Sequence, residues 1–322
     1  MVALRRRPVA GPLARERLAT ALNEPTFELL PLGSAKAQIP LIPAGAWVSV
    51  TASPSKGLDA TIELAVALER GGFRAIPHLS ARMVRDRAHL REILARLTGD
   101  GIDRAFVVGG DTTEPGDYPD GLSLLREVAD LGVTLTNVGI PCYPEGHTFI
   151  PDDALLASLA AKAPFAHYVT TQLCFNAGAV ASWIAARRAA GFQLPVQIGV
   201  AGAVEPHRLL AISARIGVKD TAGFVMKNLS FVGRLIRSGG FYRPDSLLDQ
   251  LAPLFADPVA DVRWVHLYTF NQMESTEVWR QRYVAGLLVP QSSGRWRRGA
   301  PHRTSEREPQ FDVEAAKPRG GP

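Results

Sequence analysis

A carboxylate inside an apolar segment is the first feature of this sequence that could do chemistry. Glu28 lies within residues 26–31 (TFELLP), which have the composition of a buried strand. Burial favours the protonated form of a carboxyl group, and an acid that keeps its proton near neutral pH can act as a general acid. We therefore predict that Glu28 is catalytic. The alternative is a partly exposed strand glutamate paired with Lys or Arg.

A second acidic candidate, Asp111, follows two glycines at the end of residues 104–108 (RAFVV). Gly109 and Gly110 carry no Cβ, so their backbone amides could lie close to a planar or phosphate-bearing ligand. The same three residues are equally compatible with an ordinary loop aspartate. The motif alone leaves both interpretations open.

Two histidines lie at the carboxyl ends of predicted strands and could lie near each other at the rim of a barrel. A metal site built on His78 and His147 would need Glu145 or Asp111 as a third ligand. The sequence has neither His-x-His nor HExxH spacing, which are the patterns typical of such sites. No metal is therefore expected.

Further polar residues occur where other predicted strands end. Gln172 (in TTQLCF) is costly to bury alone, so it should either bond neighbouring backbone or bind a ligand amide. The seventh strand instead brings the small residues Gly199, Ala201 and Gly202, which should leave room for a ligand. The remaining candidates at strand ends are Thr51, Tyr143, Tyr268 and Asn271.

Eight short apolar segments alternate with helical patterns and would position these groups. The predicted strands are residues 26–31, 47–51, 74–79, 104–108, 134–140, 168–175, 195–200 and 264–270. Helical spacing marks residues 59–70, 86–97, 120–129, 152–161, 177–189 and 206–216, with two or three more helices in 220–256. Asp152 and Asp153 are expected to cap the helix that follows Pro151.

Alternation of this kind predicts an α/β fold, a (β/α)₈ TIM barrel, whose active site lies at the carboxyl ends of the strands. An open doubly wound sheet is the alternative. That fold usually has a glycine-rich turn after an early strand, whereas residues 31–34 here read PLGS. The barrel is therefore the preferred fold.

The composition is that of one globular domain, with 46% hydrophobic and 21% charged residues. Residues 1–20 are expected to be an N-terminal extension, 21–290 the catalytic barrel and 291–322 a disordered tail. The net charge of +5 gathers at both ends and is interpreted as solvated termini, without a nucleic-acid partner. The absence of a secretory signal, of a long apolar run and of paired cysteines predicts a cytoplasmic protein without a membrane partner; homo-oligomers remain open.

Several motifs, taken in order from about residue 26 to 272, resemble the methylenetetrahydrofolate reductases. TFELLP resembles their opening strand FEFFPP, WVSVT their second strand, and IPHLS their APHLT. VVGGD stands where they have a strand ending in RGD. VGIPCYPEGH is similar to their AxYPExHPE, VTTQLCFN to ITQxFFD, and HLYTFN to HFYTLN.

This resemblance implies a flavin enzyme in which FAD takes a hydride from NADH or NADPH and passes it to methylenetetrahydrofolate. Glu28 would be the general acid, and Asp111 would lie near the flavin and the folate and tune hydride donation. The residues implied to bind FAD are Thr51, His78, Gly109, Gly110, Asp111, Tyr143, Glu145, His147 and Lys162. Those implied to bind the folate are Gln172, Tyr268, Asn271 and Gln272.

The sequence departs from that family at several of these positions. Gly109 replaces the arginine before Gly-Asp, and His147-Thr148-Phe149 replaces the family's HPE. Two alternatives therefore stay open. One is a folate-binding barrel enzyme that transfers a hydride or methyl group without flavin, and the other is a non-catalytic folate- or flavin-binding barrel.

Overall fold

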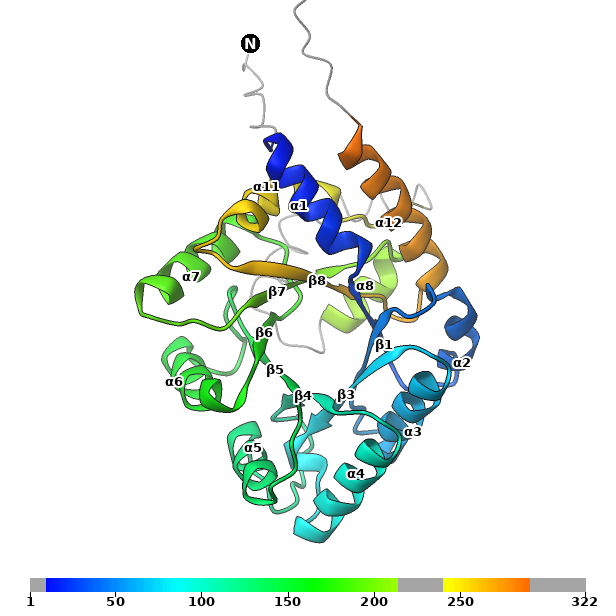
Figure 1. Cartoon of the computed structure of the whole chain (residues 1–322), viewed down its shortest axis with the longest axis vertical. Helices are drawn as coiled ribbons and strands as arrows, with labels where there is room; N and C mark the ends of the chain where they lie inside the picture. Colours follow the sequence, from blue (N-terminus) through cyan, green and yellow to red (C-terminus); the bar gives the residue numbers. More distant parts are fainter. Residues whose placement is uncertain (1–9, 214–239, 290–322) are drawn as a thin grey trace, which may run out of the picture. The chain divides into compact units, whose positions relative to one another are not determined.

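In the computed structural model, which describes residues 10–213 and 240–289, eight parallel strands close into a barrel. Each strand pairs with the next along the chain, and β8 pairs back with β1 (Figure 1). The predicted (β/α)₈ fold is thereby confirmed. The strands are β1 (Thr26–Leu29), β2 (Trp47–Val50), β3 (Arg74–Ser80), β4 (Arg104–Val108), β5 (Asn137–Cys142), β6 (Tyr168–Thr171), β7 (Val196–Ala201) and β8 (Val262–Tyr268).

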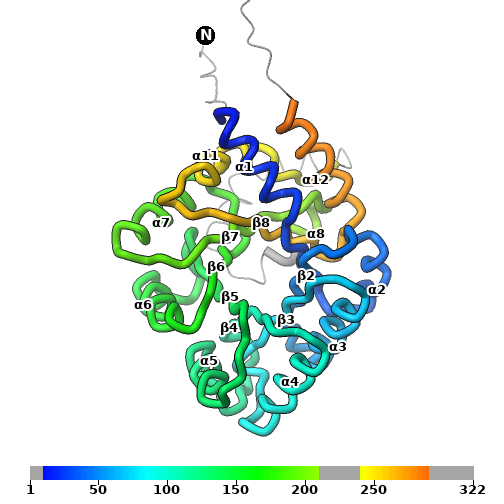
Figure 2. Tube along the Cα trace, in the orientation of Figure 1, coloured from blue at the N-terminus to red at the C-terminus, as the bar shows by residue number. Residues whose placement is uncertain are grey.

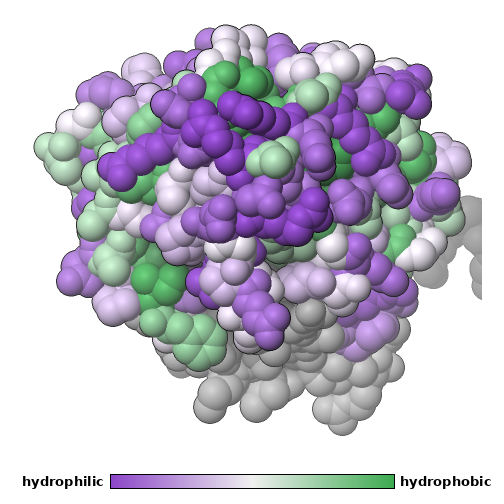
Figure 3. Space-filling model, turned by 90° about the horizontal axis from the view of Figure 1, so that it is seen from below, coloured by the Kyte–Doolittle hydropathy of each residue, from purple (hydrophilic) through white to green (hydrophobic). Residues whose placement is uncertain are grey.

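The helices lie outside the strands, as expected for parallel strands that are covered on the outer face (Figure 1). The described helices are α1 (Pro12–Asn23), α2 (Ala35–Gln38), α3 (Gly57–Arg70), α4 (Arg87–Gly99), α5 (Gly121–Asp130), α6 (Asp152–Lys162), α7 (Ala177–Ala189), α8 (Pro206–Ser213), α11 (Asp245–Ala256) and α12 (Met273–Leu288). Seen from the side on which α4 and α5 lie, the described surface is mainly hydrophilic, with separate hydrophobic patches (Figure 3).

Polar side chains begin several of these helices. The Asp86 carboxylate accepts a hydrogen bond from the backbone N–H of His89 at the start of α4. Asn176 caps α7 in the same way. The expectation that Asp152 and Asp153 cap α6 was wrong, because Pro151 occupies the cap position and both aspartates lie in the first turn. There their negative charge still faces the positive end of the helix dipole.

Helix α1 is part of the helix layer, so the predicted boundary at residue 20 falls inside a helix. Leu18 and Leu22 on α1 are fully buried. The helix packs against α11 and α12 beside β8 (Figures 1 and 2). The Arg15 guanidinium donates to the carbonyl of Leu287, and Arg280 donates to the carbonyl of Leu22. Contacts from distant parts of the chain therefore fix this segment.

The predicted strand boundaries differ most from the structure at β5 and β6. β5 begins at Asn137 rather than at residue 134, and β6 ends at Thr171 rather than at residue 175. After β6 the Cys174 thiol donates to the carbonyl of Gln172, within a turn. Apolar residues continue beyond Thr171, the last residue of β6 that pairs, so the composition of the sequence could not show where the strand ends. The predicted tail 291–322 and residues 214–239 of the last helical region lie outside the described residues.

Successive side chains of a strand point to opposite faces, and in β1 this separates two environments. Phe27 and Leu29 belong to the large core between strands and helices. Thr26 and Glu28 take the other face and bond with side chains of β7 and β8. The barrel interior is therefore partly polar, and its groups form the candidate site.

Candidate active site

Glu28 lies in the barrel interior beside a histidine of the neighbouring strand. The Glu28 residue is 7% exposed, and its Oε2 lies 3.2 Å from Nε2 of His266 on β8, which is itself buried. The Thr269 hydroxyl donates to the backbone carbonyl of Glu28 at 2.5 Å. The predicted acid is thus desolvated and held in one geometry, and an exposed glutamate paired with Lys or Arg is excluded.

A second histidine occupies the interior opposite this pair. His78 Nε2 and the Ser49 hydroxyl are hydrogen-bonded at 2.6 Å, and both residues are buried. Burial lowers the pKa of His78 to about 3, and the nearby His266 adds to this effect. His78 is therefore neutral at ordinary pH. It was predicted to line FAD, whereas the structure places it against Ser49 and the Phe106 ring.

Stability should fall as the pH drops, because His78 gains a proton only when the chain unfolds. The folded pKa of about 3 lies below the unfolded value of 6.5, so this contribution is lost as the pH falls from about 6.5 toward about 3. At pH 5 the loss is about 2 kcal/mol. Urea unfolding at pH 7 and pH 5 measures it. Glutamine does not titrate, so in His78→Gln the free energy of unfolding should change less between pH 7 and pH 5, by about that amount. An equal change in the variant and the wild type would contradict the prediction.

Tyr268 crosses the interior above His266 and fills space that the sequence had suggested was open. Its hydroxyl donates to the carbonyl of Thr171 at 3.1 Å, and its ring centroid lies 4.7 Å from that of His266. A Cβ on Gly199 would lie 2.6 Å from this ring, and one on Gly202 would lie 2.4 Å from the Thr276 hydroxyl. The expectation that these glycines leave room for a ligand was therefore wrong, because side chains of the protein occupy the room.

Asn271, predicted to bind substrate, instead forms hydrogen bonds that join the turn after β8 to the residues after β1. Its side chain accepts from the N–H of Leu30 and donates to the carbonyl of Leu30 and to the Ser34 hydroxyl. Phe270 and Asn271 both have a positive φ, of 52° and 55°. Such a conformation is unfavourable for Phe, so the bonds of Asn271 hold a strained turn directly after the strand that carries His266.

Other predicted ligand groups also have partners within the protein. Gln172 Oε1 accepts from the N–H of Leu173, the first of the two alternatives considered for it. Gln272 donates to the Glu205 carboxylate at 2.7 Å and accepts from its backbone N–H. Glu145 Oε1 accepts from the N–H groups of Phe175 and Asn176, both at 2.7 Å. Glu145 thereby orients the start of α7.

Groups still available to a ligand gather at the carboxyl ends of β2, β3 and β4. The buried hydroxyl oxygens of Thr51 and Ser80 have no hydrogen-bond partner among the described residues. Gly110 has a φ of +88°, and a Cβ there would lie 2.0 Å from the Ser80 hydroxyl. Asp111 is exposed beside it, and nothing lies within 4 Å of a Cβ on Gly109. Two unsatisfied donors beside a glycine loop are characteristic of a site for a polar ligand.

Lys162 is the last residue of α6, and it is buried. It is 8% exposed and makes no side-chain hydrogen bond or ion pair to any described residue. Burial lowers its pKa, while the Asp120 carboxylate and the Cys142 thiol oppose the change. A buried ammonium without a close anion is well suited to accept a phosphate.

The rings of Tyr143, His147 and Phe149 lie in sequence against one another after β5. The ring centroids of Tyr143 and His147 lie 5.5 Å apart, edge to face, and those of His147 and Phe149 lie 6.0 Å apart. Burial raises the pKa of Tyr143 to about 12, so its hydroxyl keeps its proton. Phe149 is 82% exposed. Aromatic surface therefore extends from the predicted cofactor residues to solvent.

Prediction from sequence missed three residues of this arrangement, namely His266, Ser49 and Ser80. Each lies two positions from a residue that was identified, respectively Tyr268, Thr51 and His78. Two positions along a strand is one repeat of the pleat, so these side chains had to share the same face. The alternation rule could therefore have found them.

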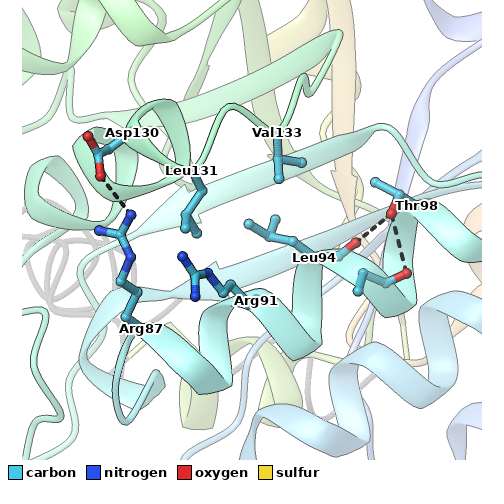
Figure 4. Close-up of a pocket in the computed structure, with 8 residues that line it drawn as sticks. Arg87, Arg91, Leu94, Thr98, Asp130, Leu131 and Val133 are labelled. Atoms are coloured by element: carbon cyan, nitrogen blue, oxygen red, sulfur yellow. Dashed lines mark hydrogen bonds and ion pairs between the residues drawn. The ribbon is translucent and has the colours of Figure 1, made fainter.

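Two hollows lie away from this region. A cavity of about 80 Å³ at the amino end of the barrel is lined by Glu24, Thr26, Trp47, Ile76, Asn137, Tyr168, Gln197 and Trp264. A surface hollow of about 440 Å³ lies between α4 and the end of α5 (Figure 4). In it Arg87 points to Asp130 and pairs with it at 2.8 Å. Neither hollow contains a predicted site residue, and catalysis in this fold takes place at the opposite end.

Within residues 10–213 and 240–289, no group of three or more His, Cys, Asp or Glu side chains is placed to hold a metal ion. No protein-family model matches the chain. Among solved structures, the chain resembles a GH18 chitinase from Cycas revoluta with 9% identity and a TM-score of 0.44, covering 82% of this chain and 99% of that one.

It also resembles a protein from Burkholderia cenocepacia assigned as a lyase/mutase, with 14% identity, a TM-score of 0.41 and coverage of 85% of this chain and 86% of that one. A third similar structure is the copper homeostasis protein CutC assigned in Streptococcus agalactiae, with 11% identity, a TM-score of 0.37 and coverage of 76% of this chain and 99% of that one. Likenesses at this level carry no argument about the reaction, and the strand pairing itself establishes the fold.

Proposed function

We propose that this protein is an oxidoreductase similar to methylenetetrahydrofolate reductase. It would transfer a hydride between NAD(P)H, FAD and a folate one-carbon unit. The observation that carries the proposal is the desolvated Glu28 inside the barrel, whose side chain meets His266 rather than a Lys or Arg. The motifs around Glu28, Asp111 and HLYTFN resemble that family in the order in which they occur.

The residues at the carboxyl ends of β2 to β5 fit FAD. The hydroxyls of Thr51 and Ser80 lack partners among the described residues, and nothing lies within 4 Å of a Cβ on Gly109. Lys162 supplies a buried ammonium for a phosphate, and Tyr143 a ring for stacking. When bound, FAD supplies the hydride.

In this proposal Glu28 gives its proton to the folate nitrogen that leaves as the methylene bridge opens. The hydrogen bond from Thr269 to the backbone carbonyl of Glu28 fixes the position of the acid. The Tyr268 ring lies against His266, and its hydroxyl donates to the Thr171 carbonyl of β6. Exposed Asp111 places a negative charge at the rim, where it would oppose further negative charge on a reduced cofactor.

The absorption spectrum of the purified protein tests this proposal. We expect flavin bands, either at once or after reconstitution with FAD, and bleaching on anaerobic addition of NADH or NADPH. Methylenetetrahydrofolate should then restore the bands. A colourless protein that also fails to bind FAD would rule out the flavin-dependent reaction.

The second candidate is a folate enzyme that transfers the hydride directly from NAD(P)H. It is favoured by the open space at Gly109, where the family has an arginine, and by Glu145, whose carboxylate holds backbone amides. Folate-dependent oxidation of NADH by flavin-free protein would identify this candidate. Loss of the same turnover on removal of flavin would exclude it.

No helix among the described residues is long and apolar enough to span a membrane. We propose that the protein acts in the cytoplasm on a small folate, within one-carbon metabolism. Light scattering of the purified chain would show whether it forms homo-oligomers. Activity recovered in a soluble cell fraction would support the location.

A further inference from the structure

Glu28 and His266 form a buried contact between neighbouring strands inside the barrel. His266 presents Nε2, one of its two titratable nitrogens, to Oε2 of Glu28 at 3.2 Å. Both side chains are more than nine-tenths buried. In register, His266 lies level with Thr26, one layer below Glu28, so it approaches the acid from the side away from the carboxyl end.

We propose that His266 is a positioning residue that returns a proton to Glu28 after each turnover, so that the acid of the reaction is the Glu28–His266 pair. This inference rests on the proposed function for its catalytic part. The pairing itself is a property of the free protein and can be tested without substrate.

Other titratable groups lie around the Glu28–His266 pair. His78 on β3 faces it but stays neutral, since its surroundings favour the uncharged ring. Tyr268 lies on the other side, and burial keeps its hydroxyl protonated, with Glu28 adding to the effect. The further titratable groups that act on Tyr268 are Cys174, Tyr143 and Cys142. Glu28 is thus the carboxylate in contact with His266.

The proton balance is simple. Glu28 releases its O–H proton to the leaving nitrogen of the folate and becomes a carboxylate. His266 takes up one proton from solvent water, and its Nε2–H then passes a proton to Oε2 of Glu28. The acid and the neutral ring are restored, one proton enters for each proton delivered, and no electron is transferred.

His266→Gln separates this role from a structural one. The glutamine amide can still donate a hydrogen bond to Glu28, but it cannot release a proton. We expect kcat to fall by about tenfold or more, as for loss of a proton-transfer group, with KM changed less than twofold and FAD affinity retained. A kcat within twofold of the wild type would overturn the proposal, because a hydrogen-bond donor alone would then suffice.

Infrared spectroscopy tests the pair without turnover. The band of the protonated Glu28 carboxyl group is assigned by its loss in Glu28→Gln. In His266→Gln this band should disappear, as the pH rises, about one pH unit or more higher than in the wild type, because the variant has no charged ring to favour the carboxylate. An unmoved band would overturn the pairing. If the wild type binds no FAD and turns over no folate, the proposed function fails. The pairing of Glu28 with His266 is then tested by the shift of this band alone.

A variant-free measurement covers the case in which His266→Gln does not fold. In wild-type full-length protein with ring-labelled histidine, the His266 ring band and the Glu28 carboxyl band should change over the same pH range, because coupled groups share one proton. Changes in separate ranges would overturn the proposal.

Discussion

Replacing Glu28 by Gln should lower kcat of the folate half-reaction by about 10²- to 10⁴-fold, the range typical of a lost general acid. Gln is similar in size and can still bond His266, so the barrel should stay folded. FAD affinity and reduction by NADH should remain within twofold of the wild type, since they do not use this proton. Stopped-flow measurement of the two half-reactions separates the effects.

Glu63→Gln is the matched control, because Glu63 is exposed on α3 and lies in the helix layer rather than in the barrel interior. Its two half-reactions should equal those of the wild type. If Glu28→Gln binds folate and loses no turnover, Glu28 is not the acid. If the wild type binds folate or flavin without any turnover, the barrel is a binding protein, and its Glu28 serves the interior alone.

The sequence predicted the barrel well because its signal is repeated. Eight apolar segments at similar spacing identify the fold even when single boundaries are off by several residues, as at β5 and β6. It also identified Glu28, because a charge inside an apolar strand is unusual and points to the side of the strand away from the helices. A local pattern was sufficient in both cases.

Partners within the site could not be predicted in the same way. Asn271 binds Leu30, and Gln272 binds Glu205, through contacts between residues 241 and 67 positions apart. The residues next to Asn271 and Gln272 in the sequence do not show whether such a side chain bonds a distant part of the protein or binds a ligand. Asn271 and Gln272 were expected to bind a ligand and instead bond the protein.

Gly199 was also expected to leave room for a ligand, and its substitution should have a large effect on stability. A Cβ there would lie 2.4 Å from the carbonyl oxygen of Thr171 and 2.6 Å from the Tyr268 ring. The carbonyl belongs to the neighbouring strand β6 and cannot move without disturbing the barrel. We expect Gly199→Ala to lower the free energy of unfolding by about 3 kcal/mol.

Urea unfolding monitored by circular dichroism measures this loss, with Gly99→Ala as the control. Nothing lies within 4 Å of a Cβ on Gly99, in helix α4, so alanine there should be neutral or stabilise by up to about 1 kcal/mol. Removing the ring in Gly199→Ala/Tyr268→Ala should recover only part of the loss, because the Thr171 carbonyl still opposes the methyl group. A stable Gly199→Ala single variant would mean that β6 and β7 can separate locally, and then the space beside Gly199 could admit a ligand after all.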